Sequence, residues 1–335
     1  MSSQQQQRQV SGCIVVVAKC PIPGKSKTRL IPLLGKDGSS KLAKAMLSDV
    51  LLTLEHCPEL KNVNKVLLYA PGDETGLSIM TSILDEIRIE GCIGTEGECS
   101  SGTSRRCWRL LPMISPNLQS SDLGDILQHA LDRVVKAPWN QNQEEQNTIS
   151  TGVVFLGMDS PEIALPDIVK GLQLALMVVD KDGEHEASES RLPALLCPSD
   201  DGGYGMLCVP STSVSKGIFQ NVYWSHPLTA VSQLKALTDA SIPVVLGQLM
   251  HDIDEPEDVT KLCQRLSSRA KIGTENKIAA AAKPMGLDIC SSYESSGGGG
   301  RSAEDSKVAQ VQSTHPECKY TKLALKELDM LDTKD

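Results

Sequence analysis

Short apolar segments alternate along the chain with longer segments in which apolar residues recur at helical spacing. Residues 13–18 are continuously apolar and rich in β-branched side chains, which is typical of a strand buried on both faces. Similar runs predict strands at 64–71, at 152–161, on both sides of SDDGGYG (199–205) and at 242–247. Helical spacing predicts helices at 39–56, 74–88, 120–137, 166–179, 226–240 and 255–268. This alternation predicts a three-layer α/β/α sandwich around a mostly parallel sheet.

Changes in composition divide the chain into segments. Residues 1–11 are polar and we expect them to be disordered, whereas 12–267 carry the alternating pattern of one domain. Residues 268–316 contain AAAA and GGGG, which predicts a disordered low-complexity tail, and 317–335 have the pattern of a short isolated helix. Within the domain we predict loop insertions near 90–116, 138–150 and 181–192.

Composition narrows the classes of protein. Apolar residues make up 40% of the 335 residues but aromatic residues only 3%, so the core is expected to be aliphatic. The net charge of -9 and the scarcity of aromatic side chains argue against a nucleic-acid partner. The eleven cysteines form no C-x-x-C pair, so we expect reduced, mostly buried thiols. No apolar run approaches the ~18 residues of a membrane span, which favours a soluble, cytoplasmic protein.

Charged residues gather directly after the predicted strands. In open α/β sheets, ligands bind at the carboxyl ends of the strands. The first strand is followed by AKCPIPGKSKTRL (18–30), which holds four cations, and later strands are followed by carboxylates. The cations are Lys19, Lys25, Lys27 and Arg29, and the carboxylates are Asp159, Asp200, Asp201, Asp252 and Asp254. Carboxylates suit Mg²⁺ or Mn²⁺, which bridges phosphate oxygens while Lys and Arg neutralise the remaining charge. The pattern therefore predicts a site for a metal-bound diphosphate.

Each acidic motif also has a structural explanation. Asp159 before Ser-Pro can cap the following helix, DDGG can be a hairpin turn, and DIDEPED can be an ordinary helix start. His226 and His251 flank these motifs as possible general bases, although a structural or surface role is favoured for both. Trp224 can face a ligand or belong to the core, and Ser225 is a natural N-cap.

The basic segment contains GKS, which resembles the end of a Walker A loop. The Walker pattern requires glycine five residues before Gly24, and that residue is Lys19. Pro21 and Pro23 also remove backbone N–H donors from a loop that would have to donate them. The segment is therefore predicted to bind phosphate through its side chains.

The chain resembles a GT-A-type family, related to nucleotide-diphospho-sugar transferases, that is found beside radical-SAM enzymes and labelled as arsenosugar-biosynthesis-type glycosyltransferases. The matching segments, in the family's order, are AKCPIPGKSKTRLIPLLG, QSSDLG, FLGMDSPEI, DDGGYGMLCV, WS and DIDEPEDV. They span 12–267, and the first and fourth are specific. The family usually carries an arginine shortly after the Leu-Gly of the DLG segment, where this chain has Asp125, Ile126 and Leu127.

The resemblance implies a role for each matching residue. Its phosphate loop would comprise Lys19, Gly24, Lys27, Thr28 and Arg29. Its metal ligands would be Asp159, Asp252 and Asp254, and Asp201 to Tyr204 would form the wall of its acceptor site. We further predict Asp159 and Asp201 as catalytic residues, and Asp200, Gly202, Gly203, Tyr204, Trp224 and Ser225 as the acceptor site.

The sequence leaves three functions open. The first is a metal-dependent transferase that takes a nucleotide-activated donor, a nucleotide sugar above all, and a small-molecule acceptor. The second is a nucleotidyltransferase that takes a nucleoside triphosphate and releases pyrophosphate. The third is a non-catalytic nucleotide-binding scaffold, which the missing arginine near Ile126 and the long insertions motivate.

Overall fold

The protein is described here from a computed structural model, which covers residues 10–93, 107–114, 118, 120, 122–137, 148–178, 192–281 and 317–331. Several expectations fall outside these residues: the N-terminal segment up to residue 9, most of the insertions at 138–150 and 181–192, and the tail over 282–316.

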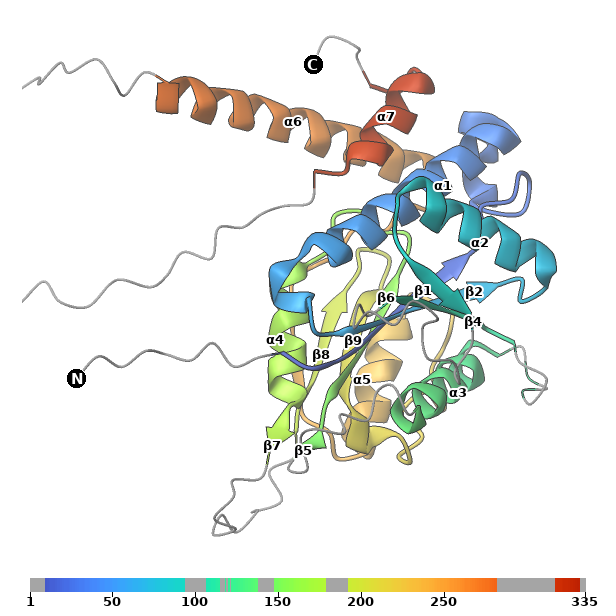
Figure 1. Cartoon of the computed structure of the whole chain (residues 1–335), viewed down its shortest axis with the longest axis vertical. Coiled ribbons are helices and arrows are strands. Elements are labelled where there is room, and N and C mark those ends of the chain that lie inside the picture. Colours follow the sequence, from blue (N-terminus) through green and yellow to red (C-terminus); the bar gives the residue numbers. More distant parts are fainter. Residues whose placement is uncertain are drawn as a thin grey trace, which may run out of the picture.

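A sheet, drawn between the helices in Figure 1, forms the middle layer. It has eight strands in the order β10-β8-β9-β6-β1-β2-β4-β3. β9 runs antiparallel to both β6 and β8, whereas the other neighbouring pairs are parallel. The predicted mostly parallel sheet is therefore confirmed. Its strands are β1 (Gly12–Lys19), β2 (Asn64–Ala70), β3 (Gly91–Ile93), β4 (Trp108–Pro112), β6 (Gly152–Gly157), β8 (Ala194–Pro198), β9 (Tyr204–Pro210) and β10 (Val244–Leu246). Two short strands, β5 (Thr148–Ser150) and β7 (Met177–Val178), pair separately.

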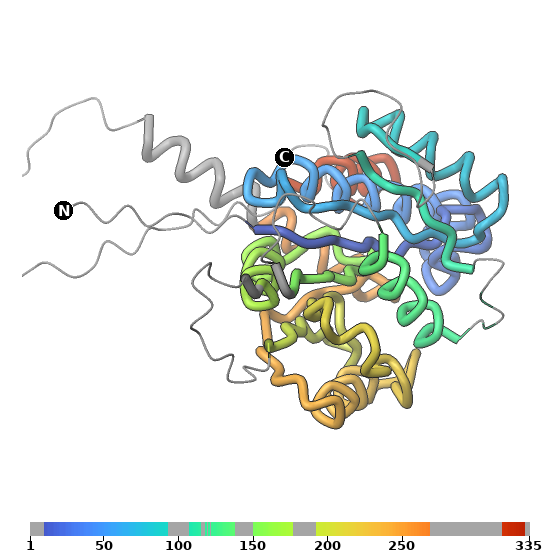
Figure 2. Tube along the Cα trace, turned by 60° about the horizontal axis from the view of Figure 1, so that its bottom comes forward, coloured from blue at the N-terminus to red at the C-terminus, as the bar shows by residue number. Residues whose placement is uncertain are grey.

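Helices cover both faces of the sheet, which confirms the three-layer sandwich (Figures 1 and 2). α1, α2 and α4 pack on one face, α3 and α5 pack on the other, and α6 and α7 lie outside α1. The bounds are α1 (Ile31–His56), α2 (Glu74–Glu86), α3 (Leu123–Lys136), α4 (Leu165–Ala175), α5 (Thr229–Asp239), α6 (Pro256–Ala281) and α7 (Lys319–Glu327). No helix in the described ranges is long and apolar enough to cross a membrane.

Local sequence explains where several helices begin. The Asp122 carboxylate accepts bonds from the backbone N–H groups of Gly124 and Asp125, so it caps α3. α1 begins earlier than predicted because a kink at Gly35 (φ 70°) joins a short preceding turn to the helix.

Residues 91–112 differ from the prediction of a loop. β3 and β4 lie there, as the outer strands of the sheet next to β2. β3 is too short to show a periodic pattern, and Gly and Ser in the intervening segment hide it further. A disulfide joins Cys92 of β3 to Cys107, so the expectation of reduced thiols is wrong for this pair. The other cysteines of the described residues are free, and all except Cys263 are buried.

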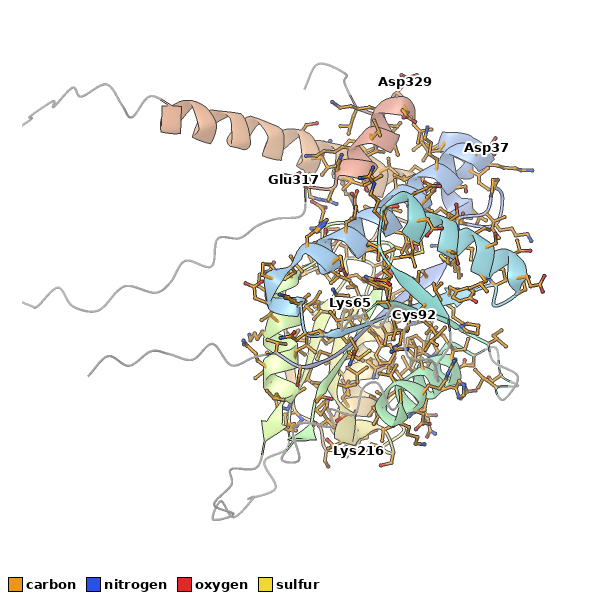
Figure 3. The ribbon with its side chains drawn as sticks, viewed as in Figure 1. Asp37, Lys65, Cys92, Lys216, Glu317 and Asp329 are labelled. Atoms are coloured by element: carbon orange, nitrogen blue, oxygen red, sulfur yellow. A yellow bond between two sulfur atoms is a disulfide. The ribbon has the colours of Figure 1, made fainter. Side chains whose placement is uncertain are left out.

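The C-terminal part differs from the prediction in two ways. α6 continues to Ala281, whereas disorder was expected from 268. α7 forms as predicted but is not isolated, because it packs against α1 and contributes to the same apolar cluster (Figure 3 labels Glu317 and Asp329 at its ends).

Candidate active site

The charged segments singled out in the sequence follow strands whose carboxyl ends meet at one edge of the sheet, here called the rim. β1 leads to Lys19, β6 to Asp159, β8 to Asp200 and β10 to the segment 247–255. β1 and β6 are parallel, and β8 shares their direction because both β6 and β8 are antiparallel to β9. The rim is thus a product of strand order and direction.

Lys27 lies at the centre of the rim's charged groups. Its ammonium contacts the Asp159 carboxylate at 2.8 Å and the Asp254 carboxylate at 2.6 Å. The Lys27 side chain is only 6% exposed, while the two aspartates are 39% and 44% exposed. Burial alone lowers the pKa of Lys27, but the charges of Asp159 and Asp254 outweigh it, and the pKa lies above its usual value. Lys27 is therefore a cation held between two carboxylates.

The loop before Lys27 is shaped by bonds to its own backbone. The Ile22 carbonyl accepts from the backbone N–H groups of Lys25 and Ser26 and from the Ser26 hydroxyl. The Ser40 hydroxyl of α1 donates to the Pro21 carbonyl at 2.7 Å. The backbone donors of Lys25 and Ser26 are thus already engaged, which agrees with a loop that presents side chains to phosphate. Lys27 itself has a left-handed φ of 48°, which is uncommon for a residue other than glycine.

The remaining predicted phosphate-loop residues surround this centre. Lys19 and Thr28 are exposed, and the Arg29 guanidinium lies 3.3 Å from the exposed Glu255 carboxylate. Gly24 has a φ of 76°, a conformation that favours glycine. These groups lie at the protein's surface, where an anionic ligand has access to them.

Asp252 and Asp254 differ in charge environment although they are two residues apart. Burial favours the neutral form of Asp254, but Lys27, Arg29 and Lys19 together hold its pKa below its usual value. Burial, followed by the negative charges of Asp201 and Asp254, raises the pKa of Asp252 to about 6. The rim therefore carries more carboxylate than Lys27 neutralises, a balance that favours a further cation.

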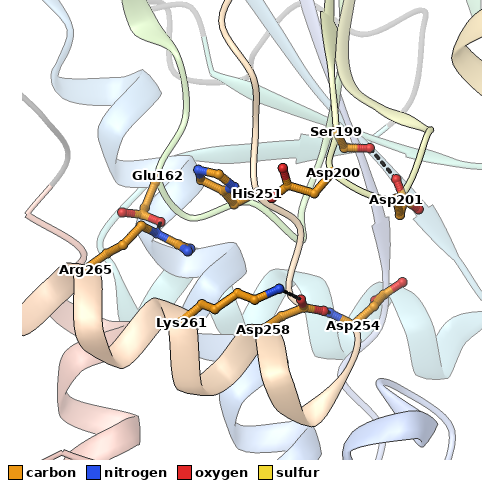
Figure 4. Close-up of polar contacts among 9 residues, drawn as sticks. All are labelled: Glu162, Ser199, Asp200, Asp201, His251, Asp254, Asp258, Lys261 and Arg265. Atoms are coloured by element: carbon orange, nitrogen blue, oxygen red, sulfur yellow. Dashed lines mark hydrogen bonds and ion pairs between the residues drawn. The ribbon is translucent and has the colours of Figure 1, made fainter.

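The segment after β10 is tied to two other strand ends. The Met250 N–H donates to the carbonyl of Pro198, the last residue of β8, and the Ile253 N–H donates to the Asp159 carbonyl after β6. Asp258 of α6, which lies beside Asp254 in Figure 4, accepts from the backbone N–H groups of Asp254 and Glu255. DIDEPED is thus both the start of a helix and a part of the rim, as its two interpretations separately required.

We call Lys19–Leu30, Asp159 and 252–255 the donor side of the rim, and 199–204 with 224–225 its acceptor side. On the acceptor side, Asp201 accepts from the Ser199 hydroxyl at 2.5 Å (Figure 4). It also accepts from the Gly203 N–H at 2.8 Å. Gly202 has a φ of 83°, and an added Cβ would lie 2.0 Å from the Pro227 carbonyl oxygen. DDGG is therefore a tight hairpin turn between β8 and β9 that is also located at the rim.

His251 forms a pair that the sequence did not predict. Its Nδ1 lies 2.5 Å from the Asp200 carboxylate, and both side chains are partly exposed (Figure 4). The sequence interpretation favoured a structural or surface role for His251. It did not indicate Asp200 as a partner, because residues 200 and 251 are far apart in the chain. The bridge between Ser199 and Met250 brings the two segments together.

Tyr204, Trp224 and Ser225 are less open to a ligand than the resemblance implies. The Tyr204 hydroxyl donates to Gln233 of α5, and burial raises its pKa well above the usual range. Trp224 is half-buried, and its ring centroid lies 6.3 Å from that of Tyr204. The Trp224 ring therefore packs against Tyr204 and is only partly exposed to a ligand. Ser225 is exposed but does not cap α5, which begins after Leu228. The Thr229 hydroxyl instead closes the preceding turn by donating to the carbonyls of Tyr223 and His226.

The carboxylate oxygens of the rim suit a hard divalent cation, although the Lys27 ammonium lies between the two carboxylates that would bind it. Within the part of the chain that the structure describes, no trio of His, Cys, Asp or Glu is already arranged as a metal site. Asp159 and Asp254 nevertheless direct oxygens at one positive charge, the Lys27 ammonium. Carboxylate oxygens are the ligands that Mg²⁺ and Mn²⁺ prefer. The residues fit such an ion on condition that Lys27 turns away.

The fold is similar to that of a protein of known structure. A "putative nucleotide-diphospho-sugar transferase" from Desulfovibrio desulfuricans G20 aligns with a TM-score of 0.54 and 20% identity, over 76% of this chain and 87% of that one. The chain therefore has an α/β fold of the nucleotide-diphospho-sugar transferase kind.

Two further structures align less well. A cytidylyltransferase from Leptospira borgpetersenii serovar Hardjo-bovis has a TM-score of 0.42 and 13% identity, over 82% of this chain and 98% of that one. CMP:2-keto-3-deoxy-manno-octonic acid synthetase complexed with CTP has a TM-score of 0.39 and 13% identity, over 79% and 99%. These scores are too low to support an argument. No family model and no curated protein matches the chain.

Proposed function

We propose that the protein is a transferase that binds a nucleotide-activated donor on the donor side of the rim, with a nucleotide sugar as the favoured donor. The observation that carries this proposal is the Lys27 ammonium held between Asp159 and Asp254. A buried cation between two carboxylates from different strand ends is an arrangement that a metal-bound diphosphate can enter by exchanging partners. The likeness in fold agrees with this proposal.

Side-chain cations are proposed to bind the donor's phosphates. Lys27 would leave the carboxylates and neutralise phosphate oxygens, while the exposed Lys19 and Arg29 would approach from the surface. These cations would stabilise the charge that develops on the leaving nucleoside diphosphate. Thr28 and Gly24 complete the loop.

Asp159 and Asp254, with Asp252 beside them, would hold Mg²⁺ or Mn²⁺. When bound, such an ion neutralises the diphosphate and polarises its oxygens. Burial, and after it the negative charges of Asp201 and Asp254, raises the pKa of Asp252, so a cation would be stabilised at this place. Lys27 would then be free to contact phosphate.

The acceptor side is proposed to hold a small molecule with a hydroxyl group. That hydroxyl would attack the sugar's anomeric carbon, form the new glycosidic bond and break the bond to the diphosphate. Its proton would pass to Asp201, the base predicted from the sequence, or to His251, which Asp200 holds at 2.5 Å. Asp201 retains the free oxygen of a carboxylate whose other oxygen is bound by Ser199 and Gly203.

A nucleotidyltransferase is the second candidate, because the density of cations in the loop suits a triphosphate. The two reactions differ in their products. The purified protein is incubated with Mn²⁺, an acceptor mixture and panels of nucleotide sugars and nucleoside triphosphates. Free nucleoside diphosphate supports the glycosyltransferase, and pyrophosphate supports the nucleotidyltransferase.

Binding measurements separate both enzymes from a scaffold. Asp159→Asn and Asp254→Asn should abolish metal-dependent nucleotide binding, whereas Glu257→Gln, an exposed neighbour in α6, should retain it. Metal-dependent binding without any product would favour the scaffold. Absence of binding to every nucleotide would contradict the proposed function.

A further inference from the structure

α7 is fixed to α1 by a buried carboxylate. Asp49, in the middle of α1, is 4% exposed and accepts from the N–H groups of Tyr320 at 2.9 Å and Thr321 at 2.6 Å. α7 has no cap of its own, because its N-cap residue is Cys318, whose side chain makes no capping bond. Asp49 thus caps α7 from another helix, and its negative charge lies at the positive end of the helix dipole.

Without α7, the buried carboxylate of Asp49 would destabilise the protein. Burial raises the pKa of Asp49, and the N–H groups of Thr321 and Tyr320 act against that rise. A buried carboxylate that loses its hydrogen-bond donors is strongly destabilising. Asp49 therefore depends on α7 for its hydrogen-bond donors. The surface ion pair of Lys41 with Glu327 adds a second link between the same helices.

α7 also lies behind the residues that bear the donor side. The Cys318 thiol donates to the carbonyl of Pro161, two residues after Asp159. Cys318 and Leu325 share one apolar cluster with Leu30, next to Arg29, and with Ile253, between Asp252 and Asp254. Figures 1 and 2 show α7 lying against α1. α7 and the Cys318 before it are therefore linked to every segment that supplies the donor side, through this hydrogen bond or through the shared apolar cluster.

We infer that α7 positions the donor side of the rim from behind, so that docking of α7 and binding of a diphosphate at Lys27 stabilise each other. Lys27, Asp159 and Asp254 come from separate segments, and their contacts require those segments to stay in register. α7 links these segments on the side away from the ligand. Leu30 and Ile253 belong to the same apolar cluster as Leu325 of α7, and the Pro161 carbonyl accepts from Cys318 just before α7. Coupling between two sites is reciprocal, so a ligand that fixes the rim also fixes α7.

The first experiment measures amide hydrogen exchange without ligand. Leu325→Ser places a hydroxyl in the apolar cluster, while Leu323→Ser changes an exposed leucine of the same helix, 53% exposed. Leu325→Ser should speed exchange in α7 and in 22–31, 158–164 and 250–255 by about fivefold or more, with α3 on the opposite face unchanged. Leu323→Ser should match the wild type. If Leu325→Ser does not fold, Leu325→Ala gives a smaller disturbance of the same contact.

Two outcomes of this experiment would overturn the inference. In one, α7 loses protection while the three rim segments exchange as in the wild type, which would make α7 a passive cover. In the other, Leu325→Ser and Leu325→Ala leave α7 fully protected, which would show that the cluster does not hold it.

The second experiment tests reciprocity and rests on the proposed function. Mn²⁺ with inorganic pyrophosphate is added to the wild type, and exchange should slow at the amides of Tyr320 and Thr321 by about fivefold or more. Asp254→Asn should abolish this response. If the wild type does not bind pyrophosphate, the proposed function fails while the ligand-free experiment still decides the role of α7. Binding of pyrophosphate without any change at Tyr320 and Thr321 would contradict the coupling.

Discussion

The donor and acceptor sides of the rim are assembled from different kinds of contact. On the donor side, Lys27 binds carboxylates that follow β6 and β10, so its geometry depends on segments far apart in the chain. On the acceptor side, Asp201 binds Ser199 and Gly203 of its own turn. Lys27 is therefore fixed by tertiary structure, whereas Asp201 is fixed mainly by its own turn. Changes at Lys27 should spread across the donor side, and changes in the turn around Asp201 should stay local.

The largest effect is expected for Lys27→Met. It removes the cation that meets the donor's phosphates and leaves two carboxylates facing each other. We expect pyrophosphate affinity in the presence of Mn²⁺ to fall by about 30-fold or more, which corresponds to ~2 kcal/mol. Isothermal titration calorimetry measures it. Lys25→Met, at an exposed position of the same loop, is the control and should bind nearly as the wild type does.

Gly202→Ala is expected to lower the free energy of unfolding and to leave binding on the donor side unchanged. The φ of 83° and the 2.0 Å approach of an added Cβ to Pro227 force the turn to move. We expect a loss of about 1–3 kcal/mol in the free energy of unfolding, with donor-side affinity unchanged within about twofold. Thermal unfolding and the same titration check both statements. Gly157→Ala, where an added Cβ lies 3.9 Å from the nearest atom, is the control. A large loss of pyrophosphate affinity would mean that the two sides are not separable.

Lys27→Met should also change the binding of metal without nucleotide. The ammonium competes with an ion for Asp159 and Asp254, so its removal should raise the affinity for Mn²⁺ alone by about tenfold. Electron paramagnetic resonance of free Mn²⁺ measures this directly. Unchanged or weaker Mn²⁺ binding, with Lys25→Met as reference, would show that the carboxylates are not a metal site.

The smallest effect is expected for Arg29→Ala. Its partner Glu255 is exposed, as Arg29 is, so loss of this ion pair should change stability by less than about 0.5 kcal/mol. Pyrophosphate affinity should fall by about threefold, more at low salt than at high salt. Glu255→Gln, which frees Arg29, should not weaken binding. Unchanged affinity in Arg29→Ala at every salt concentration would remove Arg29 from the donor side.

The sequence predicted the layers, most elements and the gathering of charge at one rim, because these follow from local periodicity and from strand ends. It did not predict that Lys27 joins Asp159 to Asp254, since that contact depends on the order of strands in the sheet. The pair of His251 with Asp200 was missed for the same reason. β3 and the bond between Cys92 and Cys107 were missed because three residues of strand show no period.

α7 shows most clearly where the sequence is insufficient. A polar residue among the apolar positions of α1 is the signal that something must meet Asp49 there. The pattern of residues 317–335 predicted a helix but gave no sign of its partner, because the contact spans 271 residues. The roles of the individual rim residues stay predictions.

The contact between Asp49 and Tyr320 also has a consequence for how the chain folds. It closes a loop of 271 residues, yet each doubling of loop length adds only about 0.6 kcal/mol to the entropy of closure. Distance along the chain therefore costs little at equilibrium but delays the contact, because contacts of large sequence separation form slowly. During synthesis Asp49 leaves the ribosome long before its partner does. The donor side should thus reach its final form only after α7 has been translated.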